Sequence, residues 1–72
     1  MITNPKVGQM AKVLSSQYSD PNGDDCDRAI LATVGQTYEI GGVDKFMIGL
    51  KVPGAFGADD MWWYFSDELE AA

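Results

Sequence analysis

The residues best suited to chemistry are acidic side chains in one turn of the chain. Asp20, Asn22 and Asp24 have the alternating oxygen-ligand spacing with which a calcium-binding loop begins. The pattern then departs from a calcium loop, because Asp25 stands at the sixth position, where glycine is needed, and Leu31 at the twelfth, where a bidentate glutamate belongs. We therefore expect a solvated acidic turn, with no metal site and no cofactor.

Other catalytic residue types are scarce. Cys26 stands between the carboxylates Asp25 and Asp27, whose negative charge disfavours the reactive thiolate, and the chain has no histidine to act as a base. The adjacent carboxylates Asp59 and Asp60 have no substrate pocket marked around them in the sequence. We predict that the protein is not an enzyme.

Length and charge narrow the class further. The 72 residues include 11 acidic and 5 basic side chains, a formal net charge of −6. This charge repels phosphate backbones, so direct nucleic-acid binding is not expected. No apolar stretch approaches the roughly 20 residues of a transmembrane helix, no signal peptide is recognisable, and a single cysteine fits the reducing cytoplasm. We expect a cytoplasmic protein with a single domain over residues 1–72 and no membrane contact.

The elements that must position these residues are short, and those of the N-terminal half are the hardest to assign. Residues 6–18 fit a helical stripe of apolar side chains but also alternate as in a strand, and with Gly8 inside the segment we prefer the strand. Residues 19–24 contain a proline and an Asn-Gly pair, which predict a reverse turn. Residues 24–31 fit either a short helical turn with acids at its positive end or an extended loop arm, and both alternatives stay open.

Alternation is clearest in the C-terminal half. Residues 37–40 are typical of a short strand, and Gly41-Gly42 predicts a tight hairpin turn directly after it. Beyond that turn, four apolar side chains recur at every second position, the period of a strand with one buried face. The side chains that we expect in the core, together with Leu69, are Phe46, Ile48, Leu50 and Val52.

An aromatic run at residues 61–65 precedes the C-terminus. Its residue types favour a strand, and they stop at Ser66-Asp67-Glu68, which is typical of a helix start. Leu69 follows at the spacing needed to fold back onto the inner face of that strand. We predict that the run is the last strand and that one helical turn after it closes a small core.

The aromatic run cannot be buried completely in a domain with one core. Neighbouring residues on a strand face opposite sides, so Trp63 and Phe65 cannot share a face with Trp62 and Tyr64. The remaining aromatic surface either packs under a loop or the N-terminal segment, or forms an exposed patch that binds a protein partner or a second copy of the chain.

Three segments together resemble the SH3-like barrels. Residues 6–14 look like the opening strand of that fold, Val34-Gly35 with Tyr38 and Ile40 resembles its next strand, and Trp63-Tyr64-Phe65 followed by Leu69-Glu70 resembles its closing strand and helical turn. The resemblance implies a mainly β fold, a small antiparallel barrel with a short C-terminal helical turn. Small acidic SH3-like proteins of this kind resemble accessory proteins of bacteriophages and prophages, some of which inhibit host or defence proteins by binding them.

The resemblance and the charge together give a functional hypothesis. We predict a non-catalytic protein-binding module that inhibits a host or defence protein with a basic surface, in the host cytoplasm if it is phage-encoded, with acids standing in for the phosphates of nucleic acid. The alternatives are a homodimeric structural domain and an SH3-like nucleic-acid reader. The predicted contact residues are Phe56, Asp59, Asp60, Trp62, Trp63 and Tyr64. The predicted acidic patch consists of Asp20, Asp24, Asp25, Asp27, Asp67, Glu68 and Glu70.

Overall fold

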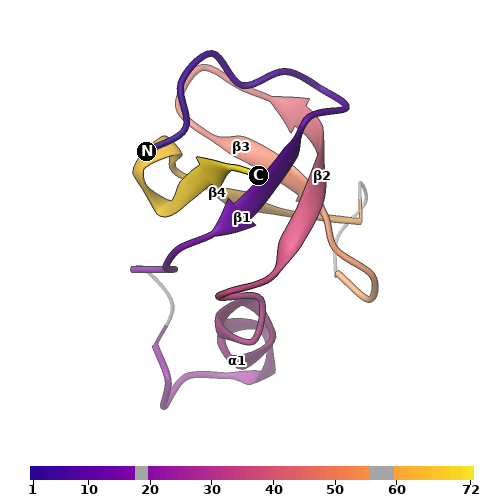
Figure 1. Cartoon of the computed structure of the whole chain (residues 1–72). Helices are drawn as coiled ribbons and strands as arrows, with labels where there is room; N and C mark the ends of the chain where they lie inside the picture. Colours follow the sequence, from indigo (N-terminus) through magenta and orange to yellow (C-terminus); the bar gives the residue numbers. More distant parts are fainter. Residues whose placement is uncertain (18–19, 56–59) are drawn as a thin grey trace.

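Five antiparallel strands form one open sheet in the order β4-β3-β2-β1-β5, so β4 and β5 are its edges (Figure 1). The computed structural model describes residues 1–17, 20–55 and 60–72. The elements are β1 (Met10–Val13), α1 (Asp25–Leu31), β2 (Thr37–Val43), β3 (Ile48–Lys51), β4 (Met61–Tyr64), the 3-10 helix η1 (Ser66–Glu68) and β5 (Leu69–Ala71). The prediction of a mainly β fold is confirmed.

Strand β1 is an interior strand of the sheet and pairs with both β2 and the edge strand β5. The preference for a strand within residues 6–18 is therefore confirmed over Met10–Val13, where Ala11 and Val13 are fully buried and alternate with exposed residues. A strand is favoured over a helix here because every second side chain points into the core. The backbone also forms hydrogen bonds with the two neighbouring strands.

The segment left open at residues 24–31 is helical. Asp24 has an extended backbone and its side chain accepts a hydrogen bond from the Asp27 backbone N–H at 3.0 Å, which caps the start of α1. Figure 1 shows α1 at one end of the molecule, below the sheet. Within the parts of the chain that the structure describes, no helix is long and apolar enough to cross a bilayer.

The hairpin between β2 and β3 turns later than predicted. Strand β2 continues through Gly41 and Gly42 to Val43, and the turn follows it, where the Asp44 backbone N–H donates to the Met47 carbonyl at 2.8 Å. The predicted turn at Gly41-Gly42 is therefore wrong. The pairing shifts register between Ile40 and Gly42, so the glycines form a bulge within the strand.

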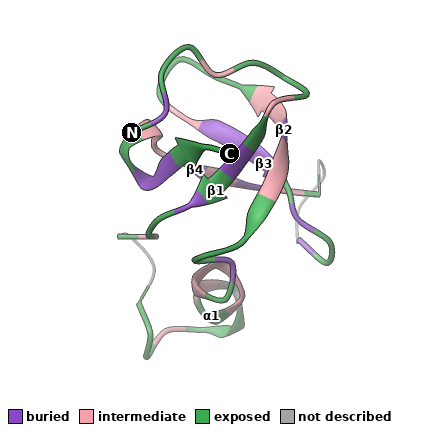
Figure 2. Ribbon diagram, in the orientation of Figure 1, coloured by how far each residue is buried: buried purple, intermediate pink, exposed green. Residues whose placement is uncertain are grey.

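The buried side chains form one hydrophobic core cluster, and Figure 2 shows buried positions along the strands of the sheet. Ile48, Leu50, Val52 and Leu69 are buried as predicted. Phe46 is not, because it lies in the turn before β3 begins, with 74% of its surface exposed and the Lys45 Nζ 5.4 Å from its ring centroid. The alternation that begins in β3 does not extend back to this position, so the assignment of Phe46 to the core is wrong.

The aromatic strand β4 is not the last strand. A single 3-10 turn, η1, follows it as the sequence indicated, but the chain then forms β5, which pairs with β1 from Ala11↔Ala71 to Val13↔Leu69. The burial of Leu69 depends on this pairing as well as on the turn. A segment of three residues is too short to show the alternation from which a strand is predicted.

Candidate functional site

Strand β4 separates its aromatic side chains between the two faces of the sheet. Trp62 and Tyr64 are 7% and 0% exposed and lie opposite Leu50 and Ile48 in the core, whereas Trp63 is half-buried on the outer face. The prediction that one pair alone is fully buried is confirmed. Burial also corrects the assignment of Trp62 and Tyr64 to a contact surface, because neither ring can reach a partner.

Trp63 lies against backbone that carries no side chains. Its strand partner is Gly49, and a methyl group built on Gly49 would lie 3.0 Å from two carbons of the indole ring. The same ring reaches one strand further, where a methyl group on Gly42 would lie 3.1 Å from its Cη2 atom. The indole therefore spans β3 and part of β2, which it can do because both positions are glycine.

Met61 lies against β2 in the same way. A methyl group on Gly41 would lie 2.7 Å from the Met61 sulfur and 2.8 Å from the Lys51 Cγ atom. The bulge in β2 explains why two consecutive glycines serve the same face, since two bulged residues oppose one residue of the partner strand. We call Gly41, Gly42 and Gly49 the glycine patch.

A groove of about 480 Å³ opens beside Met61. At its edge, Lys51 Nζ donates to Glu39 Oε2 at 3.0 Å, an ion pair between neighbouring strands that is partly exposed to solvent. The residues that line the groove are Gly41, Lys51, Val52, Pro53, Asp60 and Met61. We call Trp63, Met61, the Lys51–Glu39 pair, the glycine patch and this groove the Trp63 face.

Three predicted contact residues remain, and the structure describes one of them, Asp60. Asp60 is exposed, lines the groove and has a left-handed backbone with φ of 54°, a conformation that aspartate adopts more readily than most residues. Phe56 and Asp59 lie outside the described residues. Of the predicted set, Asp60 thus lines the groove and Trp63 lies on the outer face of β4.

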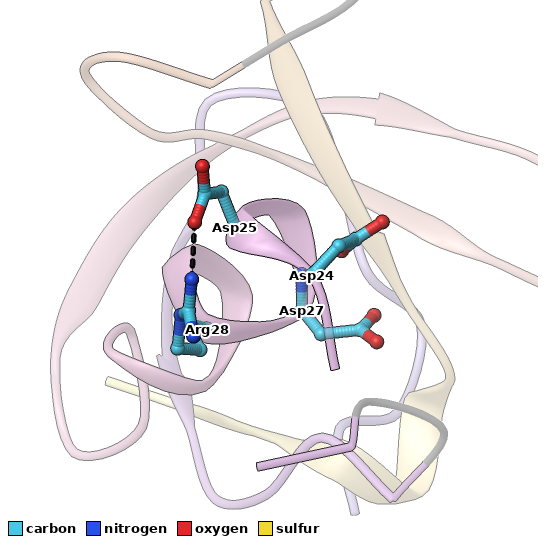
Figure 3. Close-up of polar contacts among 4 residues, drawn as sticks. All are labelled: Asp24, Asp25, Asp27 and Arg28. Atoms are coloured by element: carbon cyan, nitrogen blue, oxygen red, sulfur yellow. Dashed lines mark hydrogen bonds and ion pairs between the residues drawn. The ribbon is translucent and has the colours of Figure 1, made fainter. Parts of the chain in front are cut away.

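The acids around the start of α1 already make local bonds. Asp20 accepts a hydrogen bond from the Asn22 backbone N–H at 2.8 Å, and Asp24 caps the helix. Figure 3 shows Asp25 paired with Arg28 on one side of the helix, with the carboxylates of Asp24 and Asp27 on the other. These bonds give Asp20, Asp24 and Asp25 local roles in the turn and at the start of the helix.

Glu68 has a structural role that the sequence did not reveal. It is 3% exposed; its Oε1 accepts from the Phe65 backbone N–H at 2.8 Å and its Oε2 from the Gln17 backbone N–H at 2.7 Å. Its own carbonyl accepts from Leu14 at 2.7 Å. The carboxylate therefore joins η1 to the segment after β1, and the assignment of Glu68 to a surface patch is wrong. Asp67 and Glu70 are exposed, as that assignment requires.

The hydroxyl of the buried residue Tyr64 bonds the side chain of Thr33. The Thr33 hydroxyl donates to the Ile30 carbonyl at 2.5 Å, so the Tyr64 hydroxyl, 2.7 Å from Thr33 Oγ1, supplies the proton of that second bond. Burial raises the pKa of Tyr64 above its usual value. This pair anchors the end of α1 to the core and faces no groove.

Sequence reasoning missed the glycine patch, although a signal for it was present. Gly49 interrupts an otherwise regular strand, and glycine inside a strand indicates close approach by another group.

Across residues 1–17, 20–55 and 60–72, no three acidic or cysteine side chains gather closely enough to hold a metal ion. The Trp63 face thus offers apolar and charged contacts. Comparison of this chain with models of protein families, with curated proteins and with solved structures finds no match.

Proposed function

We propose that the protein is a non-catalytic protein-binding module that contacts its partner through the Trp63 face. The observation that carries this proposal is a half-buried tryptophan held flat on the glycine patch, two residues along β4 from Met61, which lines a groove. Tryptophan is among the residues most enriched at energetically dominant interface positions, because it buries a large area at a small entropic cost. A ring already fixed by backbone on two strands loses little further freedom on binding.

The fold that we propose for this module is SH3-like. The order of the strands and the single 3-10 turn between β4 and β5 support it, since the resemblance of the sequence also depended on a closing strand followed by such a turn. The sheet itself is open in the described residues. Fold alone does not assign a partner, so the functional proposal depends on the Trp63 face.

The prediction of an inhibitor that imitates nucleic acid is a narrower form of the same proposal. The net charge of −6 supports it, because such a charge accelerates encounter with basic proteins. Asp24 and Asp25 are engaged in helix capping and in an ion pair, which leaves Asp60, beside the groove, as an acid well placed to meet a partner. The phage-type identity of the chain stays a prediction.

Affinity capture with matched variants tests the proposal. The bait would be the wild-type chain, Trp63→Ala and Phe46→Ala, which removes an aromatic ring that is exposed outside the Trp63 face. We expect a protein that the wild type and Phe46→Ala retain and that Trp63→Ala loses. Circular dichroism and thermal unfolding of each bait would show that the variants are folded.

Two results would count against this function. Equal retention of every captured protein by Trp63→Ala would exclude the Trp63 face as the contact surface. A purified wild-type chain that sediments as a tight dimer, and that becomes monomeric in Trp63→Ala, would instead make the face a self-association surface.

A further inference from the structure

We propose that the groove of the Trp63 face accepts a cationic peptide segment, in which an apolar side chain enters the groove and a neighbouring lysine or arginine meets Asp60. This inference rests on the proposed function and adds the chemistry of the partner. It uses the composition of the groove, the pairing of its charges and the charge of the whole chain.

The walls of the groove select an apolar side chain. Val52, Pro53 and the Met61 thioether line it, and Gly41 contributes backbone only. Its volume of about 480 Å³ exceeds that of a single side chain and lies within the roughly 300 to 1,000 Å³ of typical ligand pockets. Methionine adapts its shape to different apolar groups, so Met61 permits several kinds of side chain to enter.

The two charged residues that line the groove, Lys51 and Asp60, differ in their ion pairing. Lys51 is 3.0 Å from Glu39, so this cation is matched by an anion of the neighbouring strand. Asp60 lines the groove and forms no ion pair with any residue in the described part of the chain. Among the described residues that line the groove, Asp60 is therefore an uncompensated carboxylate, which attracts a cation and repels an acidic segment.

The charge of the chain distinguishes a cationic partner from a second copy. Two chains with a net charge of −6 repel each other at separations within about 8 Å at physiological ionic strength. A cationic segment is instead attracted both by the chain as a whole and by Asp60. The same reasoning disfavours nucleic acid, whose phosphates would approach a carboxylate.

A random peptide library is the probe that tests this inference. Displayed 12-residue peptides would be selected on the immobilised wild-type chain, and the enriched peptides would be synthesised and titrated by fluorescence anisotropy. We expect enriched sequences in which an apolar residue adjoins lysine or arginine. We expect Trp63→Ala to raise Kd more than tenfold, as is typical when an anchor residue of an interface is truncated.

The charge of Asp60 is tested separately. Asp60→Asn keeps the side-chain shape and tolerates the left-handed backbone, and we expect it to raise Kd about two- to fivefold at 50 mM salt, the range for an exposed ion pair, and less at 300 mM. Asp67→Asn makes the same change at an exposed acid beyond the opposite end of β4, and we expect no effect.

The outcomes separate this inference from the function on which it rests. Peptides that lose binding to Trp63→Ala but respond neither to Asp60→Asn nor to salt would overturn the cationic partner and keep the protein-binding function. Peptides that bind Trp63→Ala as well as the wild type would overturn both. Failure to enrich any cationic peptide would overturn the inference, and a wild-type dimer that Trp63→Ala converts to a monomer would identify a second copy of the chain as the occupant.

Discussion

Trp62 and Trp63 are neighbours in β4, yet one is part of the core and the other lies on the outer surface. The difference comes from the partner strand β3. Trp62 lies opposite Leu50 and packs among side chains, whereas Trp63 lies opposite Gly49 and packs on backbone. A large aromatic residue can thus be immobilised at a surface without a layer of side chains around it.

The comparison separates stability from recognition. The inner face combines fully buried residues of several strands, including Leu50, Ile40 and Tyr64, and each contributes through the area that it removes from water. On the outer face, three positions of β2 and β3 are glycine, and the side chains of Met61 and Trp63 lie against them. This face therefore contributes less to the free energy of folding than the inner face. Substitutions on the inner face are therefore expected to lower the free energy of unfolding. Substitutions on the outer face are expected to have smaller effects on stability and to act mainly on the proposed binding.

The largest expected effect is on the inner face. Leu50→Ala should lower the free energy of unfolding by about 2 to 5 kcal/mol, since Leu50 is completely buried opposite Trp62 and its truncation leaves a cavity. Phe46→Ala should change it by less than about 0.5 kcal/mol, because that ring is exposed. Urea denaturation of both variants measures the difference, and similar costs at the two positions would contradict the assignment of the inner face.

A smaller effect is expected from filling the space under Trp63. Gly49→Val should cost about 1 to 3 kcal/mol, because its branched side chain must displace an indole that already lies within contact of the glycine. The cost should fall in the double variant Gly49→Val with Trp63→Ala, where the space is free. A double-mutant cycle by urea denaturation gives the coupling energy, and additive costs would show that the ring does not rest on Gly49.

The hydrogen bond between Tyr64 and Thr33 on the inner face is expected to contribute less to the free energy of unfolding. Tyr64→Phe removes the hydroxyl that bonds Thr33 at 2.7 Å and should cost about 0.5 to 1.5 kcal/mol, the usual net value of one such bond. Thr33 keeps its bond to the Ile30 carbonyl, so no donor is left unsatisfied. Tyr38→Phe, at a half-buried position, is the control. Equal unfolding free energies for wild type and Tyr64→Phe would mean that the bond adds no stability.

The same hydroxyl makes stability depend on alkaline pH. Burial raises the pKa of Tyr64 above the value of about 10 that it has in the unfolded chain, so the unfolded state loses this proton first. The contribution to stability is complete below about pH 10 and is lost as pH rises through the raised pKa. Tyr64→Phe should flatten the decline in the urea midpoint between about pH 9 and 11. An unchanged decline would mean that other titrating groups cause it.

The regular features of the sequence predicted this fold well. The aromatic run gave β4 and its division between two faces, and the alternation at Ile48, Leu50 and Val52 gave β3 and much of the core. The Ser66-Asp67-Glu68 signal gave the turn that brings Leu69 inward. These predictions hold because each depends on local residue type or on a period that the backbone imposes.

The errors arose where distant contacts decide the structure. Gly41-Gly42 is a common turn signal, but packing of Met61 and Trp63 across the sheet keeps it within β2. Glu68 has the residue type of a surface acid, and its burial depends on a backbone N–H that lies 51 positions earlier in the chain. The candidate site was predicted in part, since Trp63 and Asp60 were named and the groove between β2, β3 and β4 was not.

The glycine patch has a consequence for how this surface can change over time. Where three strand positions have no side chain, the chemistry displayed above them is set by Met61 and Trp63 with the ion pair at the edge. Exchange of either residue would alter the proposed contact surface while Leu50 and Tyr64 on the other side keep their packing. Under the proposed function, one or two substitutions would then change the partner at a cost that the fold tolerates.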